Sequence, residues 1–188
     1  MSTKQGFLWS RIARRIRVPV GFAFAVVYIW FARPIWWSLA AGAALAAPGL
    51  LLRAVAAGHV RKNREITTSG PYAYTRNPLY LGSIIIAAGF ALCARNWWIA
   101  AAIAVIFLAV YLPVISAEEA YLRSEFPAYQ SYSQRVPRLL PRFSLAPSDD
   151  RGEPFSRELY LKHREYNSLL GAAGLMLILA AKIIWFNR

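Results

Sequence analysis

The sequence has few of the residues that hold disulfides, metal ions and water-exposed surfaces. Its single cysteine, Cys93, among 188 residues excludes a disulfide framework and a cysteine-rich metal site. The two histidines, His59 and His163, stand 104 positions apart, so we expect no metal site. Charged residues make up 16% of the chain, against about 25% in ordinary soluble domains, and 57% of the residues are apolar. This balance excludes an ordinary soluble domain and predicts an integral membrane protein.

Five nearly uncharged runs of 15 to 20 residues define the expected architecture. A helix needs about 20 apolar residues to cross a bilayer, and about 17 suffice at the short end of the range. The runs are Val18–Ala32, Ile35–Leu52, Leu79–Ala94, Trp97–Ser116 and Leu169–Trp185. Six of the seven tryptophans lie at or near run ends, where aromatic residues meet the membrane interface. We therefore predict an all-α integral membrane protein with five transmembrane helices.

The basic residues indicate how these helices are oriented. Of the 22 lysines and arginines, 18 precede the first run or lie between the second and third or the fourth and fifth. All nine acidic residues lie on the same side. By the positive-inside rule, this predicts a cytoplasmic N-terminus and an external C-terminus. The net charge of +13 is spread over juxtamembrane segments rather than along one stripe, so we expect membrane lipids and no nucleic acid as partners.

We expect a single membrane domain over residues 1–188, with three parts. Residues 1–58 supply an N-terminal interfacial helix and two spans, and residues 59–141 supply a helical hairpin with most of the polar chemistry. Residues 142–188 supply a linker, an amphipathic helix over Phe155–Ser168 and the last span.

Small residues and prolines predict local features within the spans. Gly42 with Ala46, and Gly171 with Gly174, are spaced for close helix packing. Pro113 is expected to bend or loosen the fourth span.

The hairpin has a minimal turn near Arg95-Asn96, which makes the third and fourth spans antiparallel neighbours. At its inner end, Asn77 and Pro78 are typical of a helix cap and a first helical residue. The free N–H groups of that helix start, together with Arg76, suit a carboxylate or a phosphate. The alternative is an ordinary capped helix whose Arg76 contacts a lipid phosphate. Tyr72, Tyr74 and Tyr80 favour a ligand site over the ordinary cap, because tyrosine rings can contact the faces of a flat or cationic ligand.

Glu118 and Glu119 stand at the inner end of the fourth span, and carboxylates at a membrane boundary are costly. Adjacent helical positions differ by about 100°, so the two side chains cannot face the same way. We expect one to reach inward and the other to meet water or a basic group. A ribose diol or a sulfonium cation would satisfy such carboxylates, whereas the alternative is a solvated helix end.

Three motifs occur in order around the hairpin. Residues 76–82 read Arg-Asn-Pro-x-Tyr-x-Gly, residues 118–132 read Glu-Glu-x-x-Leu-x-x-x-Phe-x-x-Tyr-x-x-Tyr, and residues 136–141 read Val-Pro-Arg-x-x-Pro. Taken alone, the helical spacing of Leu122, Phe126 and Tyr129 also fits packing against the membrane face. Together the motifs resemble the isoprenylcysteine carboxyl methyltransferase / phospholipid methyltransferase family of integral membrane enzymes, over about residues 67–141.

The resemblance implies S-adenosylmethionine as methyl donor, in a pocket at the cytoplasmic face built around the hairpin, and a lipophilic acceptor that enters from the bilayer. It implies that Arg76 and Asn77 lie near the cofactor carboxylate, and that Glu118 or Glu119 takes the ribose or orients the acceptor. It also implies that Tyr129, Tyr132 and Arg135 close a lid over the cofactor. The candidate catalytic residues are Glu118, Glu119 and Arg76. The candidate cofactor-binding residues are Tyr72, Tyr74, Arg76, Asn77, Pro78, Tyr80, Gly82, Glu118, Glu119, Tyr129, Tyr132 and Arg135.

The chain also departs from the family pattern. Asn77 stands where many relatives have histidine, a variant of bacterial-type members, so we expect a bacterial inner membrane. Val114 stands where enzymes that methylate prenylcysteine carboxylates tend to have arginine, which disfavours a carboxylate acceptor. A lipid amine, an isoprenoid thiol or carboxylate and a hydrophobic small molecule stay open as acceptors, as does the oligomeric state. The rival functions are a sterol-reductase-like NADPH-dependent oxidoreductase and a non-catalytic membrane scaffold.

Overall fold

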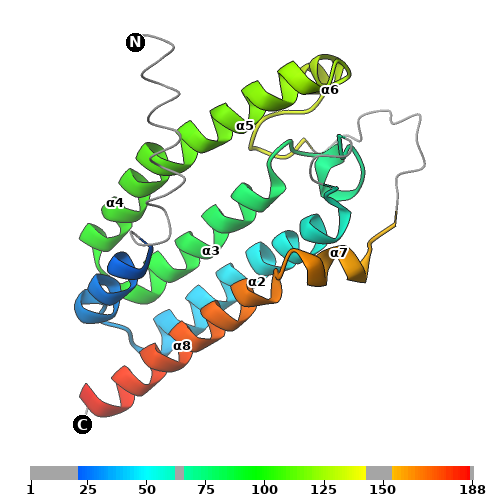
Figure 1. Cartoon of the computed structure of the whole chain (residues 1–188). Coiled ribbons are helices and arrows are strands. Elements are labelled where there is room, and N and C mark those ends of the chain that lie inside the picture. The colour runs from blue at the N-terminus through cyan, green and yellow to red at the C-terminus, as the bar shows by residue number, and fades with distance from the viewer. Residues whose placement is uncertain (1–20, 62–65, 143–153, 187–188) are drawn as a thin grey trace. The chain divides into compact units, whose positions relative to one another are not determined.

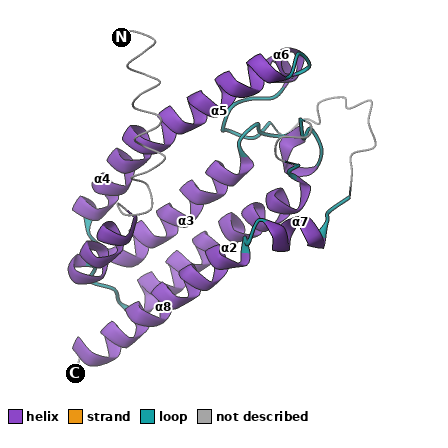
Figure 2. Ribbon diagram, viewed as in Figure 1, coloured by secondary structure: helices purple, strands orange, loops and turns teal. Residues whose placement is uncertain are grey.

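The structure is a computed structural model that describes residues 21–61, 66–142 and 154–186. Within these residues every regular element is helical and there is no strand (Figure 2). The predicted interfacial helix at the N-terminus and most of the predicted linker after Pro141 lie outside the described residues. The elements in chain order (Figure 1) are the helix Gly21–Phe31, α2 (Trp36–His59), the 3-10 turn Gly70–Ala73, α3 (Pro78–Ala94), α4 (Trp97–Ile106), the π-helical turn Phe107–Tyr111, α5 (Leu112–Glu125), α6 (Tyr129–Arg135), α7 (Arg157–Lys162) and α8 (Tyr166–Phe186).

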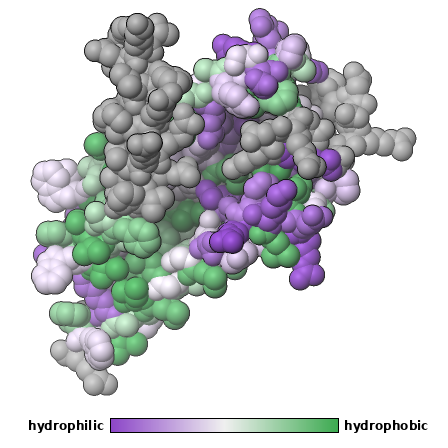
Figure 3. Space-filling view, viewed as in Figure 1, coloured by the Kyte–Doolittle hydropathy of each residue, from purple (hydrophilic) through white to green (hydrophobic). Residues whose placement is uncertain are grey.

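Three of the helices are long and apolar enough to cross a membrane, namely Trp36–His59, the continuous helix Trp97–Glu125 and Tyr166–Phe186. The helices Gly21–Phe31 and Pro78–Ala94 are apolar but shorter. The 17 residues of Pro78–Ala94 rise about 26 Å, slightly less than the ~30 Å hydrocarbon core. Figure 3 shows hydrophilic residues gathered around α6 and α7. The all-helical membrane class is confirmed, while five spans and their orientation stay predictions.

The fourth apolar run forms a helix with a π-helical turn in its middle. It begins where Asn96 Oδ1 accepts a hydrogen bond from the N–H of Trp98 at 3.0 Å. Near its centre the N–H of Leu112 donates to the carbonyl of Phe107, five residues back. Pro113 follows at once and has no N–H for the helical ladder, so the wider turn lies where the ladder is interrupted. The loosening expected at Pro113 is therefore present.

The chain divides into two compact units. The first unit comprises Met1–Ala46, Ala87–Ala120 and Ala173–Arg188, and the second comprises Ala47–Ile86 and Tyr121–Ala172. Each of α2, α3, α5 and α8 contributes residues to both units. The single membrane domain expected from the sequence stays a prediction.

In the first unit, small residues let α2 and α3 approach closely. A Cβ atom placed on Gly89 would lie 2.5 Å from the carbonyl oxygen of Gly42 and 2.9 Å from Cβ of Ala46. The buried Tyr28 adds a hydroxyl bond of 2.8 Å to the carbonyl of Phe90. The packing role predicted for Gly42 and Ala46 is confirmed.

Two features near the C-terminus differ from prediction. The expected amphipathic helix over Phe155–Ser168 is wrong as one helix, because α7 ends at Lys162 and α8 begins at Tyr166. Arg164 in the intervening turn has a φ of 52°, a left-handed conformation that cannot continue a right-handed helix. The packing predicted for Gly171 and Gly174 is not found among the described residues either, since none of their atoms outside the adjoining turns of α8 lies within 4 Å of a Cβ atom placed on either glycine.

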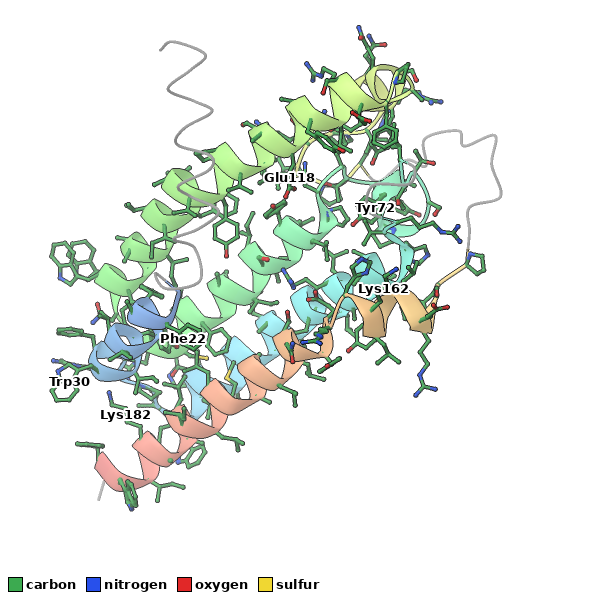
Figure 4. All side chains as sticks on the ribbon, in the orientation of Figure 1. Phe22, Trp30, Tyr72, Glu118, Lys162 and Lys182 are labelled. Atoms are coloured by element: carbon green, nitrogen blue, oxygen red, sulfur yellow. The ribbon has the colours of Figure 1, made fainter. Side chains whose placement is uncertain are left out.

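Lys182 fastens α8 to the end of the helix Gly21–Phe31 within the first unit, close to Trp30 (Figure 4). Its ammonium group donates to the carbonyls of Ile29 at 2.6 Å, Trp30 at 3.0 Å and Ala32 at 2.7 Å. A cation also complements the partial negative charge of a helix C-terminus. Lys182→Met should therefore lower the free energy of unfolding by about 1–2 kcal/mol. Unfolding of the detergent-purified chain would measure this, with the exposed Lys162→Met as a control that leaves it nearly unchanged.

Candidate functional site

The start of α3 is built as the sequence predicts. Gly70, with a φ of 57°, opens the 3-10 turn that leads into the first motif. α3 begins at Pro78, and the carbonyl of Asn77 accepts the first helical bond from the N–H of Leu81 at 3.0 Å. Proline suits this position because its fixed φ fits a helix and its missing N–H would have no helical partner there. The first motif thus ends in a helix start, whose N–H groups favour an anion.

The third motif lies directly against the first motif within the second unit. We call residues 136–142 the strap. Hydrogen bonds join the strap to residues 74–77. They include Arg76 N–H to Pro137 O at 2.9 Å, Asn77 Nδ2 to Arg138 O at 3.0 Å, Thr75 Oγ1 to Leu139 O at 3.0 Å and Arg142 N–H to Tyr74 O at 2.9 Å. Two segments some 60 positions apart in the sequence are therefore held together by main-chain and side-chain bonds.

A buried tyrosine cluster supports the same segment. The Tyr132 hydroxyl donates to the carbonyl of Tyr72 at 2.8 Å, and the rings of Tyr129 and Tyr132 meet at 62° with centroids 5.8 Å apart. Tyr72, Tyr129, Tyr132 and Val136 are all buried, and the partly buried Ile66, Leu122 and Phe126 pack around Tyr129, Tyr132 and Val136. Figure 4 labels Tyr72 beside the α3 start. Leu122 and Phe126, at helical spacing, thus pack against tyrosines.

Two arginines, Arg76 and Arg138, place positive charge in the strap and in the segment bonded to it. Nε and Nη1 of Arg76 and Nε of Arg138 are buried. The guanidinium group stays charged at any physiological pH and offers donors in a planar fork that matches a carboxylate or a phosphate. Arg76 is bonded through its N–H to Pro137, the neighbour of Arg138, so the two arginines belong to segments that touch. The arrangement suits an anionic group.

The remaining candidate residues of the second unit differ in exposure and contacts. Tyr74 is exposed, Tyr80 is half-buried, and Arg135 on α6 is exposed, with its carbonyl accepting a bond from Arg142 Nη1 at 2.9 Å. A Cβ atom on Gly82 would lie 2.6 Å from Cγ of Arg53 and 2.8 Å from the carbonyl oxygen of Gly49. Glycine at position 82 therefore permits the close approach of α2 and α3.

Glu118 and Glu119 lie on the part of α5 that belongs to the first unit. Glu118 is exposed, whereas Glu119 is 9% exposed. The two carboxylates therefore differ in environment, as their 100° separation on a helix predicts. Glu119 is the enclosed member of the pair.

Sequence reasoning missed two features of the second unit. The first is Thr75, a buried hydroxyl between the candidate residues Tyr74 and Arg76, whose only sequence signal is a small polar residue directly before the first motif. The second is the ion pair of Arg53 Nε with Glu165 Oε1 at 2.6 Å. Arg53 also donates through Nη1 to Ser83 Oγ at 2.5 Å and to the carbonyl of Leu79 at 3.1 Å, which ties α2 to the start of α3. The only sign of this ion pair in the sequence is an arginine directly after an apolar run.

The fold and the motif segments define a helical membrane protein whose polar groups gather at a helix start beside a strap. The sequence model of the phospholipid methyltransferase family matches residues 16–128, and the chain belongs to that family. The resemblance found in its motifs is confirmed.

Three curated proteins show the same kinship over shorter stretches. The cobalt-zinc-cadmium resistance protein CzcN of Cupriavidus metallidurans is 36% identical over 85 residues, which cover 45% of this chain and 39% of that protein. The nickel-cobalt-cadmium resistance protein NccN of Alcaligenes xylosoxydans is 35% identical over 89 residues, which cover 47% of this chain and 42% of that protein. The protein-S-isoprenylcysteine O-methyltransferase of Schizosaccharomyces pombe is 32% identical over 88 residues, which cover 46% of this chain and 37% of that protein. The chain thus spans about two fifths of these relatives. No solved structure matches significantly.

Proposed function

We propose that the chain transfers a methyl group from S-adenosylmethionine to a lipophilic acceptor at the cytoplasmic face of a membrane. Membership of the phospholipid methyltransferase family supports the reaction class. The observation that carries the proposal is the set of hydrogen bonds joining the strap to residues 74–77, because it brings the two arginine-bearing motifs together at a helix start. A helix start with two charged guanidinium groups suits the carboxylate of the methionine moiety.

The proposed roles follow the chemistry of each residue. Arg76 and Asn77, with the N–H groups after Pro78, take the carboxylate. Tyr72, Tyr74 and Tyr80 supply ring faces and Gly82 close packing, while Tyr129, Tyr132 and Arg135 cover the ligand. Glu118 or Glu119 takes the ribose or orients the acceptor.

When bound, S-adenosylmethionine supplies an electrophilic methyl on a sulfonium, and the displacement needs an aligned, desolvated nucleophile more than a strong base. The polypeptide's part is to fix that alignment and to exclude water. An amine or thiol acceptor must also lose a proton, and Glu118 and Glu119 are the carboxylates we propose for that task.

The acceptor and the membrane are the finer parts of the proposal. Val114, nearly fully buried, offers no charge to a carboxylate acceptor, so we favour a lipid amine, an isoprenoid thiol or a hydrophobic small molecule. The distribution of lysine and arginine supports five spans with a cytoplasmic N-terminus. Asn77 supports placing the protein in a bacterial inner membrane.

Calorimetric titration of the detergent-purified chain with S-adenosylmethionine and S-adenosylhomocysteine tests the proposal. We expect micromolar binding of both ligands, and Arg76→Ala should weaken it about tenfold to a hundredfold, since a charge-assisted bond to an anion contributes about 1.5–3 kcal/mol. Glu118→Gln and Glu119→Gln report on each carboxylate separately. Glu158→Gln, an exposed carboxylate on α7, is the control expected to bind like the wild type.

If folded wild-type protein binds neither ligand, the methyltransferase proposal is wrong. Titration with NADPH then tests the sterol-reductase-like alternative. Absence of binding by all three ligands would favour a non-catalytic membrane scaffold.

A further inference from the structure

Thr75 is a buried polar residue that the proposed roles leave unused. It is 1% exposed and belongs to the second unit. Its hydroxyl lies 3.0 Å from the carbonyl oxygen of Leu139 and 3.3 Å from that of Arg138. It also accepts a hydrogen bond from the N–H of Asn77 at 3.3 Å. One side chain therefore contacts the strap and the residue that precedes α3.

The hydroxyl of threonine has one proton to donate and two lone pairs. Here the proton is shared between two strap carbonyls, and a lone pair receives the N–H of Asn77. Valine has nearly the same shape but can form none of these bonds, so it would remove the hydroxyl's contacts with the two strap carbonyls and with the N–H of Asn77. Serine would keep the hydroxyl and lose only a methyl group.

Thr75 and Asn77, which precede and follow Arg76 in the sequence, are both bound in this network. Arg76 itself donates its N–H to Pro137 at 2.9 Å, and Asn77 donates Nδ2 to Arg138 at 3.0 Å. Three consecutive residues are thus fixed to three consecutive strap residues. The backbone positions from which the Arg76 and Arg138 side chains start depend on the same small network.

We propose that Thr75 is a positioning residue for the ligand site, which holds Arg76 and Arg138 at the separation that an anionic group of the cofactor requires. This inference rests on the proposed function. Thr75 touches neither the ligand nor the reacting atoms in this role, and acts through the two arginines. A bidentate arginine contact loses strength when the fork is misplaced, so the effect should appear in ligand affinity beyond any loss of stability.

The test compares Thr75→Val with Thr75→Ser in the full-length, detergent-purified chain, using S-adenosylhomocysteine as the probe. Affinity is measured by calorimetry and stability by the midpoint of thermal unfolding. We expect Thr75→Val to weaken binding about tenfold, the equivalent of one hydrogen bond, and Thr75→Ser to restore it to within about threefold of wild type.

Ser38→Ala is the matched control. Ser38 is a fully buried hydroxyl in the first unit that accepts the N–H of Ile35 at 3.1 Å and lies 3.0 Å and 3.4 Å from the carbonyl oxygens of Ile35 and Cys93. Its loss should lower the unfolding midpoint by an amount similar to Thr75→Val and leave the affinity unchanged.

Wild-type affinity in Thr75→Val would overturn the inference while leaving the proposed function intact. Equal loss of affinity in Ser38→Ala and Thr75→Val would also overturn it, since a general loss of stability would then explain both. If Thr75→Val does not fold, Thr75→Ala replaces it in the test. If neither variant folds while Thr75→Ser binds normally, the role of Thr75 is structural and the positioning role is overturned. A folded wild-type chain that does not bind the probe would instead refute the proposed function, and with it this inference.

Discussion

Arg53→Met is expected to lower the free energy of unfolding by about 3–5 kcal/mol, because it removes one partner of an enclosed ion pair. The side chains of Arg53 and Glu165 are only 22% and 10% exposed, and Nε lies 2.6 Å from Oε1. Without Arg53, the largely enclosed Glu165 carboxylate would lose the ion pair that compensates its charge. Denaturant unfolding in detergent measures the loss.

The effect should be asymmetric between the two partners. Glu165→Gln should cost clearly less, because Arg53 keeps its bonds to Ser83 Oγ and to the carbonyl of Leu79. The double variant Arg53→Met, Glu165→Met should recover much of the stability that Arg53→Met loses, since it removes both charges. A loss of under 1 kcal/mol in Arg53→Met would instead indicate an ordinary exposed pair, whose usual contribution is of that size.

The features that the sequence predicts well are those whose cause is local. Asn77 and Pro78 mark the start of α3, because each acts on backbone groups within a few residues. The predicted turn at Arg95-Asn96 is likewise present between α3 and α4. Pro113 similarly predicts the interruption before α5. Long apolar runs predict the helices for the same reason, since their burial in lipid depends on composition and length.

The features that the sequence misses depend on partners far away along the chain. Arg53 and Glu165 are separated by 112 positions, and Thr75 and Leu139 by 64, so no local pattern pairs them. Each residue taken alone looks like an ordinary juxtamembrane polar group. The break between α7 and α8 at Arg164 was missed because arginine has no particular preference for a positive φ.

The candidate site could be predicted from the sequence only in part. The three motifs could be recognised from residue order, and their resemblance predicted the family correctly. What the sequence could not supply is the contact between motifs, because whether the strap lies on residues 74–77 is decided by hydrogen bonds such as that from Asn77 Nδ2 to Arg138. Tyr129 and Tyr132, expected as a lid, form a buried cluster that supports the Tyr72 carbonyl. Their part in covering a ligand stays a prediction.

Gly89→Ala is expected to lower the free energy of unfolding by about 3 kcal/mol or to prevent folding. The added methyl carbon would lie 2.5 Å from the carbonyl oxygen of Gly42 and 2.9 Å from both the nitrogen and Cβ of Ala46. These atoms are backbone or directly attached to it, so no side-chain rotation relieves the overlap and α2 must move away from α3 in the first unit. Thermal unfolding in detergent measures the loss.

Gly174→Ala is the matched control. Gly174 is also a helical glycine of the first unit, but among the described residues no atom outside the adjoining turns of α8 lies within 4 Å of the new Cβ position. Because alanine is favoured over glycine inside a helix by roughly 0.5–1 kcal/mol, Gly174→Ala should stabilise the chain slightly or leave it unchanged. The two variants make the same chemical change in apolar helices, so their opposite signs would isolate the close contact between α2 and α3. Equal effects would show that Gly89 does not limit the approach of these helices, and that the packing of α2 on α3 tolerates a wider separation.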